Sequence, residues 1–190
     1  MNATTILSAA TIADRLARGR TRALMNRLAD RMARDGVDVP AFLAEVDIRR
    51  FPLKWHLTWL FSHYVERVRR LPAGDQEAVW RHLTDCDHPG IRRDLWRALS
   101  FLETIDEDIA GDVFDHAIEI VRSSKEPIAM RAHAMFAARN IALPYEELRS
   151  ELGLVLETLR RDESAAVRAR SKNMLKELRS PKARKVLNTV

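Results

Sequence analysis

Two short stretches of the sequence combine side chains that bind metals or transfer protons. In the first, HLTDCDH, His82 and Cys86 are four residues apart, so one face of a helix would present both. Zinc accepts these ligands, but a closed site needs four of them and the stretch does not complete the set. We expect the end of a helix followed by a polar turn, with no bound metal or cofactor.

The second stretch is DVFDHAIE, in which Asp112, Asp115, His116 and Glu119 would share one helix face. Such residues can bind a metal or act as acid and base. A di-metal helix bundle, however, has a glutamate three residues before its histidine, and position 113 is a valine. The apolar residues between the acids predict an amphipathic helix with a solvated acidic face.

Aromatic side chains form a third group, which contains Trp55, Trp59, Tyr64, Trp80 and Trp96. Trp55 and Trp59 would share one helix face, and Trp96 lies between Arg93 and Arg97 in sequence. Aromatic rings beside basic groups can stack on nucleic-acid bases, whereas large aromatic residues also fill helical cores. Both interpretations stay open for Trp55, Trp59 and Trp96. The chain has no GxGxxG, GxxxxGK[ST], GxSxG or HExxH motif, so we expect no enzymatic activity.

The elements that must position these residues are predicted to be helices. Apolar residues recur at helical spacing, only 6 of the 190 residues are glycine, and the 7 prolines fall at or between helix starts. A glycine inside a helix, Gly153, costs about 1 kcal/mol relative to alanine, and close helix packing is one explanation for it. The expected helices are near 4–18, 21–35, 40–48, 52–69, 75–85, 89–103, 107–122, 127–141, 144–160 and 164–179.

An aliphatic–basic pair recurs at the start of four of these helices, at intervals of 37 to 39 residues. The pairs are Leu53-Lys54, Ile91-Arg92, Met130-Arg131 and Val167-Arg168. Mostly apolar residues follow four, seven and eight positions after each aliphatic residue. This period indicates repeated helix pairs that stack to bury their apolar faces. We therefore expect Leu53, Ile91, Met130 and Val167 to be buried at equivalent positions.

These features resemble HEAT-like repeats, in which an acid precedes a Val-Arg helix opening. Asp162 before Val167-Arg168 is the closest match. Asp87 lies one residue nearer to its pair, Ile91-Arg92, and Glu126 takes the place of the aspartate before Met130-Arg131. The resemblance implies an all-α fold, a short right-handed α-α superhelix of about four helix pairs. We expect a single domain over 1–180, with an N-terminal helical cap at 1–38 and repeats over 40–179. The repeats, together with the preceding stretch LARGRTRALMNRLADRM, also resemble a small bacterial group of stand-alone HEAT-like proteins, and this resemblance implies no activity.

The resemblance also assigns roles to arginines. The arginines of the aliphatic–basic pairs, Arg92, Arg131 and Arg168, are expected to pair with acids of neighbouring turns in a structural ladder. In the family the second helix of each pair usually lines the concave face. We predict a binding surface there, formed by Arg93, Trp96, Arg97, Arg139 and Arg170.

Two functions are compatible with these helical repeats. The preferred one is a non-enzymatic scaffold whose curved surface holds a protein partner. The alternative is a nucleic-acid binder, related to HEAT-like glycosylases that excise alkylated purines. The net charge of +5 is concentrated at the two ends, including the basic tail 181–190, so only weak non-specific nucleic-acid binding is expected. A single cysteine, no signal-peptide pattern and no long apolar run favour the cytoplasm and argue against a membrane.

Overall fold

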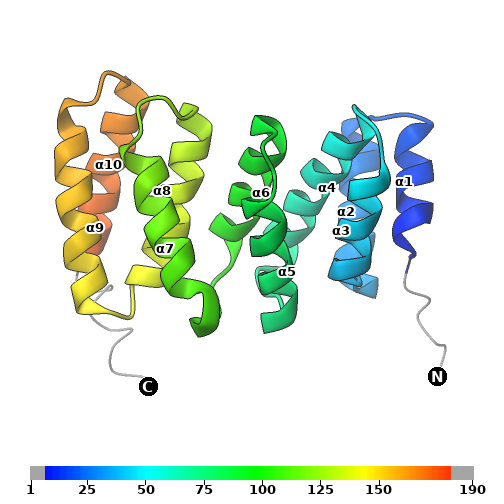
Figure 1. Ribbon diagram of the computed structural model, residues 1–190, viewed down its shortest axis with the longest axis horizontal. Coiled ribbons are helices and arrows are strands. Elements are labelled where there is room, and N and C mark those ends of the chain that lie inside the picture. The colour runs from blue at the N-terminus through cyan, green and yellow to red at the C-terminus, as the bar shows by residue number, and fades with distance from the viewer. Residues whose placement is uncertain (1–6, 181–190) are drawn as a thin grey trace. The chain divides into compact units, whose positions relative to one another are not determined.

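The computed structural model describes residues 7–180, which are helical and contain no strand (Figure 1). Their Cα positions divide into two compact units, with unit 1 ending at Leu102 and unit 2 beginning at Glu103. The prediction of a single domain over 1–180 stays a prediction. The predicted basic tail, 181–190, lies outside the described residues. No helix in the described range combines the length and the apolar composition needed to cross a membrane.

Unit 1 is built from three helix pairs in two layers. The helices are α1 (Ala9–Ala17), α2 (Arg22–Asp35), α3 (Val39–Ile48), α4 (Leu53–Val68), α5 (Ala73–Thr84) and α6 (Pro89–Phe101). The second helices form one layer, because α4 packs against both α2 and α6. The first helices form the other layer, in which α3 packs against both α1 and α5. The predicted N-terminal cap is therefore a further helix pair that continues both layers.

Unit 2 repeats this arrangement with two pairs. Its helices are α7 (Glu107–Arg122), α8 (Ile128–Ala142), α9 (Glu146–Thr158) and α10 (Ala165–Leu178), with a short 3-10 turn at Leu159–Arg161. Each helix packs against its partner in the pair, and α8 also packs against α10 while α7 packs against α9. The second helices, α8 and α10, again form one layer.

Local sequence sets the helix starts. The side chains of Ser8, Thr21, Asp38 and Ser164 each accept a hydrogen bond from a backbone N–H in the first turn of the following helix. The cap at Ser8 explains why α1 begins at Ala9 and not near residue 4 as predicted. Proline precedes or opens α4, α5, α6 and α8, where its missing N–H leaves no hydrogen bond unmade.

The core confirms the predicted repeat period with one exception. Residues four, seven and eight positions after each aliphatic residue are buried in all four helices, and so are Ile91, Met130 and Val167. Leu53, however, is only half-buried. Its counterparts are the third residues of their helices, whereas Leu53 is the first residue of α4, where the chain has just entered from the turn. The prediction for Leu53 was therefore wrong, although the register of its helix was right.

Replacing Leu95 by alanine should lower the free energy of unfolding by about 2–5 kcal/mol, because a fully buried leucine would leave a cavity in unit 1. The matched control is Leu154→Ala, since that leucine is 71 % exposed and its loss should cost less than about 0.5 kcal/mol. Urea unfolding followed by circular dichroism measures both. Equal losses for the two variants would contradict the core assignment.

Replacement of glycine by alanine should have opposite effects on stability at two positions. A Cβ at Gly153, within α9, would meet no atom within 4 Å, so close packing does not explain this glycine. Gly153→Ala should therefore stabilise the chain by about 0.5–1 kcal/mol. Gly36 ends α2 at φ 83° and ψ 165°, a conformation that side chains disfavour, so Gly36→Ala should cost about 1–3 kcal/mol. Thermal or urea unfolding gives the sign, and a loss at Gly153 would contradict the first expectation.

Candidate binding surfaces

The second-helix layer of unit 1 presents an aromatic and charged surface, which we call the α4–α6 face. It comprises Trp55, Trp59, His63 and Glu66 of α4 with Arg93 and Arg97 of α6, all half-buried. The α4 residues follow helical spacing on the side away from the buried Leu57, Leu60 and Phe61. The structure therefore places Trp55 and Trp59 at the edge of the core, with part of each ring accessible.

Asp94 organises one end of the α4–α6 face. Trp55 Nε1 donates a hydrogen bond of 3.0 Å to Asp94 Oδ2, and Arg93 donates through Nε and Nη2 to Oδ1, at 3.1 and 2.9 Å. The Arg93 guanidinium also lies 5.9 Å from the Trp55 ring centroid. Burial raises the pKa of the Asp94 carboxyl, and the Arg93 hydrogen bond partly opposes this rise. Asp94 is 1 % exposed, so it holds the surface together and is not presented to a ligand.

Arg97 organises the other end of the same face. Its Nη2 donates to Glu66 Oε2 at 2.5 Å and its Nη1 to Ser62 Oγ at 2.8 Å, while the guanidinium lies 4.8 Å from the Phe101 ring centroid. His63 Nδ1 is 3.1 Å from the same Glu66 oxygen. Burial, followed by the nearby Arg97 charge, lowers the pKa of His63 despite Glu66. Each arginine of the α4–α6 face is thus paired with a carboxylate.

Trp96 does not belong to this surface, and its predicted place there was wrong. Its side chain is fully buried and packs edge-on against Trp80, with ring centroids 6.1 Å apart. The reason is that α6 packs against both α4 and α5, so its buried face is wider than a single stripe. Arg93 and Arg97, three residues before and one after Trp96, contact α4 instead, through the Trp55 ring and Ser62 Oγ.

The remaining predicted binding residues meet around an aromatic ring in unit 2 that the sequence analysis had not singled out. Phe136 of α8 lies under two guanidinium groups, with its centroid 5.6 Å from Arg139 and 5.0 Å from Arg170. Arg139 Nη1 also donates to Glu177 Oε2 at 2.9 Å. Arg170 is exposed, and no carboxylate in residues 7–180 pairs with it. The available signal was that Phe136 lies three residues before Arg139 and one repeat period before Asn173.

The predicted ladder arginines have different surroundings. Arg131 is buried and donates to the Val121 carbonyl through Nε and Nη2, at 3.0 and 2.9 Å, and to Asp162 Oδ2 at 2.6 Å. Arg168 is exposed and donates through Nη1 to the backbone carbonyls of Asp162 and Glu163. Both arginines therefore converge on the turn before α10. Arg92 is half-buried in α6.

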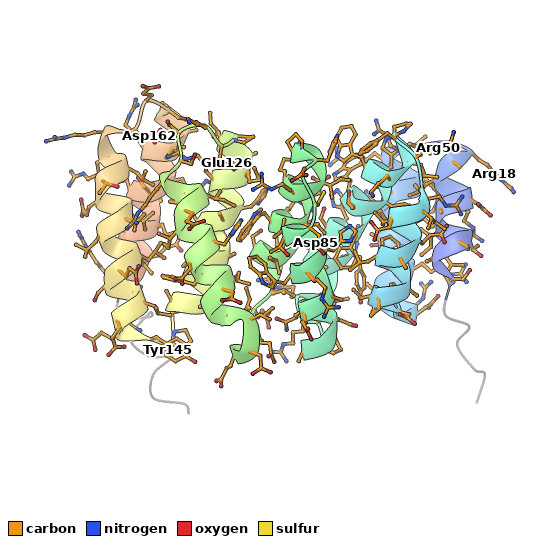
Figure 2. The ribbon with its side chains drawn as sticks, viewed as in Figure 1. Arg18, Arg50, Asp85, Glu126, Tyr145 and Asp162 are labelled. Atoms are coloured by element: carbon orange, nitrogen blue, oxygen red, sulfur yellow. The ribbon has the colours of Figure 1, made fainter. Side chains whose placement is uncertain are left out.

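Asp162 is the acid on which this turn depends. It lies at the same end of unit 2 as Glu126, away from Tyr145 (Figure 2). Its Oδ1 accepts a 2.9 Å hydrogen bond from the Ser164 backbone N–H, just before α10 begins. The Arg131 hydrogen bond, aided by that of Ser164, holds the pKa of the Asp162 carboxyl below its usual range. Through its bonds to the Val121 carbonyl and to Asp162, the Arg131 side chain thus links the end of α7 to the start of α10.

The two stretches that contain potential metal ligands, HLTDCDH and DVFDHAIE, do not form metal sites in the described residues. His82 and Cys86 line a cavity of about 290 Å³ together with Asp47, and His82 Nδ1 is 3.6 Å from Asp47 Oδ2. The acids of α7 are exposed, and His116 lies 4.0 Å from Glu119. Among the described residues, no group of three or more His, Cys, Asp or Glu side chains has metal-binding geometry.

Replacing Asp162 by asparagine should lower the free energy of unfolding at pH 7 by about 1–3 kcal/mol, the range for hydrogen bonds to charged groups. Since folding lowers the pKa of Asp162, its contribution is complete above the unfolded value, near 3.8, and is lost as the pH falls through the folded value. The variant should therefore lose less stability than the original chain between about pH 5 and pH 3. Urea unfolding across this range measures the effect. Glu163→Gln is the exposed neighbouring control, and an identical pH profile for Asp162→Asn would contradict the assignment.

A comparison with known proteins adds one match. Neither the search of curated proteins nor the search of solved structures finds a significant similarity to this chain. The model of one protein family, described as the HEAT repeat domain, matches residues 15–178, from the end of α1 to the end of α10. The stacked helix pairs, their repeat period and this match agree, and the chain belongs to the HEAT repeat domain family.

Proposed function

We propose that the chain is a non-enzymatic scaffold that holds a protein partner on its second-helix layers. Stacked helix pairs present extended surfaces that suit macromolecular partners, and proteins of this family commonly bind other proteins. The cytoplasm is the compartment we expect for it.

The observation that carries the proposal is the composition of the α4–α6 face. Arg93 and Arg97 lie there with indole rings, and each is already paired with a carboxylate, Asp94 or Glu66. Tryptophan and arginine are enriched at the energetic centres of protein interfaces. Binding of a nucleic-acid phosphate backbone needs unpaired cations, and the carboxylates of this face would repel the phosphates. The mixture of charges supports a protein partner over nucleic acid.

Replacing Arg93 and Arg97 together by glutamine should abolish binding of the partner, because glutamine keeps a polar side chain but removes the charge and the cation–aromatic contacts. The full-length chain is immobilised and used to capture proteins from its native cell at physiological salt, after nuclease treatment. Arg81→Gln in the first-helix layer is the matched control, since Arg81 is exposed and paired only with Glu77 among the described residues. Unfolding curves confirm that the variants fold.

The expected result is a protein retained by the original chain and by Arg81→Gln but lost with the double variant. Retention by all three would place the partner elsewhere. A labelled DNA duplex that binds tightly at physiological salt, and whose binding needs Arg93 and Arg97, would replace the protein scaffold with a nucleic-acid binder.

A further inference from the structure

The two helix layers of unit 2 carry opposite charges. The first helices, α7 and α9, contain nine carboxylates and two arginines. The second helices carry a single acid, Glu177, and six basic residues: Arg131 is buried, whereas Arg139, Arg168, Arg170, Lys172 and Lys176 are at least partly exposed. A two-layer unit with this distribution attracts a negatively charged ligand to the surface of α8 and α10 and repels it from the other side.

A trough runs along this basic layer, between α8 and α10. It consists of two adjoining cavities of about 310 and 370 Å³, which share Ala166 and Arg170 in their walls. Four alanines line it, Ala129 and Ala132 of α8 with Ala166 and Ala169 of α10. Buried Met135 and Val167 also line it. From Ala166 to Glu177 the trough follows about 16 Å of α10, the length of about three helical turns.

The ends of the trough differ in chemistry. Ile128, at the start of α8, is 50 % exposed and lines the first cavity. The second cavity is lined by Phe136 and Arg170, and there the guanidinium stacks on the ring. Arg139 is already bonded to Glu177, whereas Arg170 has no carboxylate partner among residues 7–180. The trough therefore offers apolar contacts along its length and one available cation beside them.

We propose that this trough binds an acidic, amphipathic α-helical segment of a protein partner. Apolar side chains at i, i+3 or i+4 and i+7 of the ligand helix would lie over the alanines, and a carboxylate beside them would pair with Arg170. The proposal rests on the proposed scaffold function and names the chemistry of the partner in unit 2. A nucleic acid fits less well, since the first cavity is mainly apolar and Glu177 lines the second.

The test uses the full chain and a labelled 14-residue helical peptide with leucines at i, i+3, i+7 and i+10 and glutamates on the flanking positions. A second peptide has lysine in place of each glutamate. Fluorescence anisotropy at physiological salt should show saturable binding of the acidic peptide only. Arg170→Glu should weaken it by at least about tenfold, because it replaces an attractive charge by a repulsive one, and should allow the lysine peptide to bind.

Two further variants make the result specific. Lys172→Glu is the matched control, because it reverses a charge on α10 outside the trough and should change binding by less than about threefold. Ala132→Glu places a carboxylate in the trough on a half-buried position and should weaken binding without unfolding the chain, as circular dichroism can confirm. Equal effects of Arg170→Glu and Lys172→Glu, or no saturable binding of the acidic peptide, would overturn the proposal.

The outcome is separable from that of the scaffold function. Arg93→Gln with Arg97→Gln alters unit 1 and should leave peptide binding unchanged. If the acidic peptide fails to bind while capture of a cellular partner still depends on Arg93 and Arg97, this inference alone fails. A DNA duplex that binds more tightly than the peptide, and does so through Arg170, would also overturn it.

Discussion

A single pair of helices cannot bury the apolar side chains on both of its sides, and the structure depends on this constraint. A second helix inside a unit packs against its own partner and against the second helices beside it, as α4 does against α3, α2 and α6. Stacking supplies the missing cover, and burial of apolar surface contributes most of the stabilisation. Helices α2 and α8 illustrate the result, because both are buried along the stripe that faces the next repeat.

Stacking also determines where polar groups meet. Trp55 reaches Asp94 across 39 residues, Arg139 reaches Glu177 across 38, and Arg97 reaches Glu66 across 31. The first two separations match the repeat period and the third is about two helical turns shorter, because adjacent second helices lie side by side with equivalent positions as neighbours in space. Each bond joins one repeat to the next, so these side chains fix the relative register of helices that apolar packing alone would position less strictly.

Much of the fold could be predicted from the sequence, because the apolar period and the proline positions are local signals. Apart from the start of α1, the approximate helix bounds needed nothing else, and neither did the buried positions after Ile91, Met130 and Val167. Leu53 and Trp96 were misplaced for a tertiary reason: the first depends on where α4 leaves its turn, and the second on how many helices cover α6. For the same reason Phe136 and the trough beside Arg170 became visible only when α8 and α10 were packed side by side.

The bond between Arg131 and Asp162 has a consequence for how unit 2 opens. One guanidinium bonds the Val121 carbonyl near the end of α7 and also Asp162, whose other oxygen holds the Ser164 amide before α10. Fraying of α10 from its N-terminus therefore leaves a buried cation without its counter-charge, and displacement of the end of α7 removes the Val121 carbonyl that accepts two of its hydrogen bonds. Partial unfolding of either repeat is penalised by the other, so we expect amide hydrogens of the two helix pairs to be protected from exchange as one cooperative block.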